Sequence, residues 1–145
     1  MEYRSGNIGR VFTVRFDDGD DFLGGLGELA RKEEIRCGWF HVLGGLRQAG
    51  VVTGPREPVM PPEPVWQDVD TVREVLGFGT IFWDDQGPRI HLHAGLGEHG
   101  QGFIACVRKN TRAYLILEVF IVEVQGFAAG RPWFEAGGFN QLTFY

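Results

Sequence analysis

The sequence predicts an α+β fold in which one main helix packs against a mostly antiparallel β-sheet. Glycine makes up 22 of the 145 residues, about twice its usual share, and this favours many tight turns over long helices. Only one segment spaces its apolar residues as a helix does, whereas several others alternate or are rich in strand-forming residues. The length fits one domain over residues 1–145, with its core at about 10–124.

Composition narrows the classes of function. An apolar fraction of 43% with 23% charged residues is typical of a globular chain. The formal net charge of −5 argues against a surface built mainly to hold nucleic-acid phosphates. The longest apolar stretch, 113–124, contains two glutamates and is too short to span a bilayer, so no membrane association is expected.

Two observations indicate the compartment. Residues 1–10 are polar and show no apolar core of a secretory signal. Cys37 and Cys106 are the only cysteines and cannot form a disulfide framework. We therefore expect a cytoplasmic protein with reduced thiols.

The first half of the chain predicts a strand, the helix and a second strand region. Residues 10–16 alternate polar and apolar side chains as a half-buried strand does, and 17–21 supply a turn and a helix N-cap. The helix follows and closes with the charged residues 31–34; its apolar face comprises Phe22, Leu23, Leu26, Leu29 and Ala30. Residues 35–46 predict a strand, and 47–53 its continuation or its partner.

The second half predicts a long loop and then more strands. Five of the seven prolines lie in 55–64, which excludes a central strand and indicates either a solvated connection or a functional flap. Strands are expected within 69–83 and at 89–94, 102–108 and 113–124. The aromatic tail, 125–145, is expected to pack back on the sheet or on a neighbouring subunit.

The strongest candidate site is the H-x-H pattern of His91 and His93. Residues two apart on a strand project from the same face, so both imidazoles can converge on one divalent ion such as zinc. A metal site normally needs three protein ligands, and the sequence shows only two. Two ordinary histidines on a half-exposed strand are therefore the alternative.

Two carboxylates could supply acid–base chemistry. Glu118 lies in a strongly apolar segment, where burial would raise its pKa unless it is paired. A salt bridge to an arginine on the next strand is the alternative, and Glu74 carries the same ambiguity.

Two short motifs are rejected as functional sites. Residues 95–100 read G-x-G-x-x-G after a strand, but a strand pattern follows where a dinucleotide site needs a helix, so a hairpin turn is expected. Gly130-Arg131-Pro132 matches the core of an AT-hook without its flanking basic residues and is expected to be a turn.

The order of several segments resembles the PPC (plants and prokaryotes conserved) domain family. The segments are a glycine turn at 40–46, R-E-V-L-G-F-G-T-I at 73–81, R-I-H-L-H-A at 89–94, A-C-V-R at 105–108 and L-E-V-F-I at 117–121. The resemblance covers about 10–124. It implies a strongly bent sheet with one packed helix, a homotrimer, and the label of a predicted DNA-binding protein.

The chain departs from the family at one position of the metal motif. Many prokaryotic members carry a third histidine in a Gly-Gly-His element, whereas 105–107 read Ala-Cys-Val here, with Val107 in the place of the histidine. Cys106 and Arg108 resemble a subset that reads G-C-x-R. Strand alternation is expected to point Cys106 to the face opposite the histidines, so only His91 and His93 are carried over as metal ligands.

The leading interpretation is a stand-alone trimeric PPC-type domain with a DNA-binding or regulatory role and a divalent metal at His91 and His93. The net charge and the missing AT-hook oppose DNA binding itself. The alternative is a metal-dependent enzyme acting on a small molecule, with Glu74 or Glu118 as its acid or base. A structural or ligand-sensing trimer, with the proline loop as its contact surface, is a third interpretation.

Overall fold

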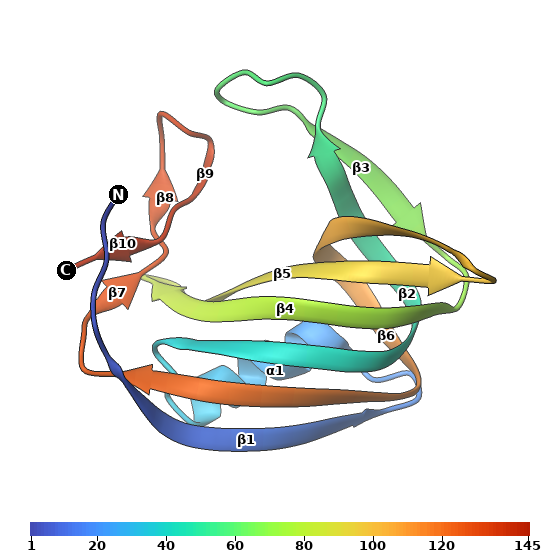
Figure 1. Cartoon of the computed structure of the whole chain (residues 1–145), viewed down its shortest axis with the longest axis horizontal. Coiled ribbons are helices and arrows are strands. Elements are labelled where there is room, and N and C mark those ends of the chain that lie inside the picture. The colour runs from blue at the N-terminus through green and yellow to red at the C-terminus, as the bar shows by residue number, and fades with distance from the viewer.

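The computed structural model describes all residues, 1–145, and contains one helix, a six-stranded antiparallel sheet and two short ladders near the C-terminus (Figure 1). In chain order the elements are β1 (Asn7–Asp17), α1 (Phe22–Lys32), β2 (Gly38–Pro55), β3 (Pro64–Val69), β4 (Arg73–Asp84), β5 (Gly87–Glu98), β6 (Gln101–Gln125), β7 (Ala129–Gly130), β8 (Trp133–Phe134), β9 (Phe139–Asn140) and β10 (Thr143–Phe144). The predicted fold class is confirmed. The helix is not long and apolar enough to cross a membrane.

Two long strands bend the sheet back on itself. The strand order is β1-β6-β5-β4-β2-β3, and β6 also pairs with β2. The first half of β2 pairs with β4 and the second half with β3, while β6 pairs with β5 at its start and with β1 at its end. Since β2 and β6 also pair with each other, the sheet has an inner face that encloses the core and an outer face.

Helix α1 covers the inner face, where local sequence and packing agree. Its N-cap is Asp21, whose side chain accepts a hydrogen bond from the Gly24 backbone N–H. Phe22, Leu26 and Ala30 are buried in a single apolar cluster shared with the strands. The predicted helix is therefore confirmed, and it ends near the charged residues expected to close it.

Strand β6 differs from the prediction of two separate strands at 102–108 and 113–124. It is one strand of 25 residues. The polar run 109–112 resembles a turn, and Asn110 indeed has a φ of +54°, as does Leu115 at +55°. These residues produce bulges within the strand, because β2 continues alongside and supplies backbone partners with shifted register.

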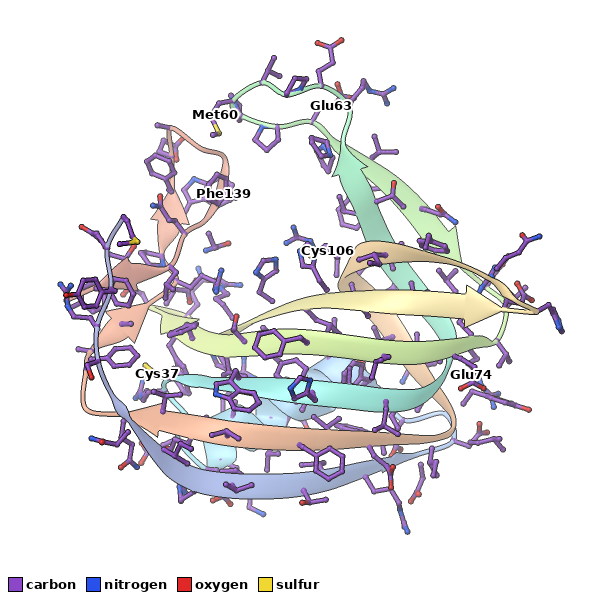
Figure 2. The ribbon with its side chains drawn as sticks, in the orientation of Figure 1. Cys37, Met60, Glu63, Glu74, Cys106 and Phe139 are labelled. Carbon is purple, nitrogen blue, oxygen red and sulfur yellow. The ribbon has the colours of Figure 1, made fainter.

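The proline loop and the C-terminal segment meet above β5. Residues 56–63 form the connection between β2 and β3, as predicted. The tail returns to the sheet through a hydrogen bond from the Arg131 backbone N–H to the Trp83 carbonyl, at 2.7 Å. Gly138 lies so close to Pro61 that an added Cβ would be 2.7 Å from the proline Cβ. Figure 2 shows Met60 of the loop and Phe139 of the tail approaching from opposite sides.

Candidate metal centre and adjoining cavity

His91 and His93 project from the outer face of β5, as the H-x-H spacing predicts. Alternate residues of the strand, Leu92 and Ala94, are buried in the core. The two imidazole Nε2 atoms are 3.1 Å apart. Two nitrogen donors therefore converge on one point beside the sheet.

Cys106 completes a group of three donors, contrary to the expectation that it points away. It pairs directly with His93 across the β5–β6 ladder, so both side chains stand on the same face. Its neighbours Ala105 and Val107 belong to the core cluster, whereas Cys106 does not. The donor atoms of His91, His93 and Cys106 all lie within 4.8 Å of one another.

The sequence did contain a signal for this pairing. The β5–β6 hairpin turns at His99 and Gly100, both with positive φ, as the G-x-G-x-x-G segment was expected to do. Counting back from this two-residue turn places His93 opposite Cys106. The family motif points instead to position 107 as the third ligand, but the side chain of Val107 lies in the core.

The donor group fits a zinc-like ion. Ligand nitrogens at about 2.05 Å from a tetrahedral ion are about 3.3 Å from each other, close to the observed 3.1 Å. Two imidazoles and a thiolate form a donor set typical of zinc, and they would leave a fourth position open. Cys37 and Cys106 are both free thiols, so the sulfur is available.

Burial and neighbouring cations set the protonation of the donors. Burial, followed by the charges of Arg131, His93 and Arg108, lowers the pKa of His91 to about 4, so its ring is neutral near pH 7. Burial raises the pKa of the Cys106 thiol, against the opposing effect of Arg108 and Arg131. A bound cation would reverse this tendency by stabilising the thiolate.

His91 also lines a cavity of about 520 Å³ between the sheet, the proline loop and the tail. Its charged lining residues are Arg89, Arg108 and Arg131, and no carboxylate lines it. The rest of the lining is Val52, Pro62, Pro64, Trp66, Ile90, Val107, Trp133, Gly138, Phe139 and Asn140. The site thus joins a donor group to a chamber large enough for a small molecule.

Arg131 is a cavity residue that the sequence interpretation missed. Arg131 and Pro132 connect β7 to β8, which lie in separate two-stranded ladders, so they do not form the expected turn. The Arg131 guanidinium, however, donates from Nη2 to the Thr80 hydroxyl at 3.1 Å, and Thr80 pairs with His91 across the β4–β5 ladder. Only the return of the tail to the sheet brings this residue to the site.

The two candidate acid–base carboxylates lie elsewhere. Glu74 is exposed and pairs with Gly97, four residues along β5 from His93, or about 13 Å. Glu118 is half-buried on the part of β6 that pairs with β1 and β2. Arg15 lies directly across the β1–β6 ladder from Glu118, but Arg15 forms its ion pair with Asp17 instead. Neither glutamate therefore reaches the histidines within one chain.

Comparison with known proteins gives a family and a fold. The family model of the Plants and Prokaryotes Conserved (PCC) domain matches residues 3–125. The comparison with curated proteins gave no significant match.

Solved structures share the fold at low sequence identity. A metal-containing protein from Archaeoglobus fulgidus is similar with a TM-score of 0.85, 22% identity and 99% of each chain covered. A plant- and prokaryote-conserved (PPC) protein from Pyrococcus horikoshii has a TM-score of 0.82 and 20% identity, covering 97% of this chain and 96% of its own. A Ralstonia eutropha JMP134 protein whose name proposes DNA binding has a TM-score of 0.73 and 20% identity, over 92% and 90%.

Proposed function

The chain belongs to the Plants and Prokaryotes Conserved (PCC) domain family, and from this premise we propose that it binds one divalent transition-metal ion, such as zinc, through His91, His93 and Cys106. The convergence of three suitable donor atoms on one face carries the proposal. The similar protein from Archaeoglobus fulgidus, which is named as metal-containing, supports it. The ion would supply Lewis acidity at an open position beside the cavity.

Metal analysis of untagged protein purified without chelator tests this proposal. We expect about one equivalent of metal, and a sulfur-to-metal charge-transfer band after replacement by Co²⁺. His91→Ala and Cys106→Ser should remove both signals. The matched controls are His99→Ala, an exposed histidine outside the site, and Cys37→Ser, the other buried thiol. Metal-free preparations that also fail to take up Co²⁺ would contradict the proposal.

We further propose that the domain assembles as a homotrimer through the outer face of its sheet. Leu43, Leu76 and Ile104 are exposed there, and the register of β2, β4, β5 and β6 places them in one row. Phe78 and Phe120, in the adjoining row, are also exposed. A contiguous apolar face of this extent is typical of an interaction surface. We also propose a cytoplasmic location, because both cysteines are free thiols.

DNA binding has less support than metal binding. Some similar structures have names that propose it, but the net charge of this chain is −5 and no AT-hook is present. The role that we propose is therefore regulatory. Binding to a DNA duplex should be weak and strongly salt-dependent, and tight sequence-selective binding at physiological salt would contradict this.

The enzymatic alternative depends on the cavity. Because His91 lines it, a small molecule inside could reach the open position of the ion. Glu74 and Glu118 are too distant to assist from the same chain, so any proton transfer would need another group.

A further inference from the structure

Two of the three arginines that line the cavity lack a counter-ion. Arg89 is paired with Asp84, whereas neither Arg108 nor Arg131 forms an ion pair. Arg131 makes one side-chain hydrogen bond, to Thr80, and its Nε atom is buried without any partner. A partly buried positive charge without a counter-ion is costly, so the cavity favours an occupant that carries negative charge.

The two unpaired arginines act on the same space. Arg108 and Arg131 line the same cavity beside His91, so their two positive charges face one enclosed space. Repulsion between cations that face one cavity is relieved when an anion binds between them. Arginine is also the side chain best suited to oxyanions, because its planar fork can donate two parallel hydrogen bonds.

Aromatic side chains also line the cavity. They are Trp66, Trp133 and Phe139, which line it together with Pro62 and Pro64, and we call these five residues the aromatic wall. Trp66 and Trp133 are each about half exposed. Flat apolar groups pack well against such rings, and a volume of about 520 Å³ suits a small organic molecule.

We infer that the cavity binds a small organic anion, whose carboxylate or phosphate group contacts Arg108 and Arg131 while its flat apolar body packs on the aromatic wall. This ligand class goes beyond the proposed metal function and does not require it, because neither arginine belongs to the donor group. Since His91 contributes to both sites, a bound anion would also lie beside the ion.

Calorimetric titration of the metal-free protein tests the inference, with phenyl phosphate and benzoate as probes. Benzamide has a similar ring without the charge and is the control ligand. We expect at least one of the two anions to bind, and benzamide to bind about tenfold more weakly or not at all.

Variants locate the binding site. Arg131→Gln and Arg108→Gln should each lower the affinity for the anion by about tenfold or more. The control is Arg15→Gln, which changes an exposed arginine on β1 and should leave the affinity unchanged. Arg108 is exposed, so its variant keeps the test valid if the Arg131 variant folds poorly. Cys106→Ser should retain the anion, so the two proposals fail separately.

Three outcomes would overturn the inference. The first is that neither anion binds, and the second is that benzamide binds as well as benzoate, which would make the cavity a purely apolar pocket. The third is that the two arginine variants bind a short DNA duplex more weakly than the parent does, while their affinity for both small anions is unchanged.

Discussion

His93 and Cys106 stand directly opposite each other on β5 and β6, and this pairing turns a two-histidine pattern into a three-donor group. The cysteine side chain is almost fully buried, while His93 is exposed. The sulfur is thus held at the base of the group and the imidazole at its rim. The pairing also indicates which residue can be exchanged for another ligand.

Cys106→His should preserve metal binding and change its spectrum. A histidine at this position would present a third imidazole to the same point, so we expect the metal content to be retained. Because the thiolate is lost, the Co²⁺ form should lack the sulfur charge-transfer band. Cys106→Ala provides the comparison, since it removes the donor and should lose the metal. Equal metal content in all three proteins would show that Cys106 is not a ligand.

Leu76→Asp should dissociate the proposed trimer into folded monomers. Leu76 is 69% exposed in the single chain, so a charge there costs little within the subunit but would be buried in the assembly. Light scattering should give three times the chain mass of 16.2 kDa for the parent and a single chain mass for Leu76→Asp. Val59→Asp, in the proline loop, is the control and should remain trimeric. A trimeric Leu76→Asp, or a monomeric parent, would contradict this interface.

Replacing either of two glycines of α1 by alanine should change the free energy of unfolding, but in opposite directions. A Cβ on Gly25 would lie 2.6 Å from the buried Phe16 ring, so Gly25→Ala should lower the free energy of unfolding by about 1–3 kcal/mol. At Gly27 the nearest atom is 3.7 Å away, on Arg31, so Gly27→Ala should raise it by about 1 kcal/mol through helix propensity. Urea denaturation measures both, and a stabilising Gly25→Ala would show that the helix can move away from Phe16.

Glu123 should make stability depend on acid pH. Hydrogen bonds from Arg10, of 2.9 Å and 3.0 Å, hold the pKa of Glu123 at about 2, below its ordinary value of 4.5. A lowered carboxyl pKa stabilises the fold above about pH 4.5, and this contribution is lost as the pH falls toward 2.

Glu123→Gln tests this contribution. The variant should be less stable than the parent at pH 7 and nearly equal to it at pH 2, as denaturation midpoints would show. Glu33→Gln, which removes the second carboxylate near Arg10, should change stability less because Glu33 is more exposed. A difference between parent and Glu123→Gln that is independent of pH would contradict the assignment.

Features set by neighbouring residues were predictable from the sequence. The N-cap at Asp21, the helix that follows and the shared face of His91 and His93 are all confirmed by the structure. Each depends on spacings of two to four residues, which the backbone geometry of a helix or strand fixes directly.

Features set by long-range pairing were not predictable in the same way. The continuity of β6 depends on β2, whose paired residues lie more than fifty positions earlier in the chain. Arg131 enters the cavity only because the tail returns to β4. The placement of Cys106 is intermediate, because the hairpin turn defines its register, whereas the family pattern points to Val107 as the third ligand. Glu118 remained ambiguous because its neighbours lie on separate strands.

The register of β6 links the donor group to the hydrophobic interior, because adjacent residues of this strand belong to each. The same ladder of backbone hydrogen bonds seats Val107 in the core and Cys106 on the outer face. A slip of one residue in this ladder would exchange the sulfur atom for two methyl groups and, at the same time, turn a thiol toward the core. The protein therefore cannot misplace its softest donor without first giving up the contacts that keep it folded.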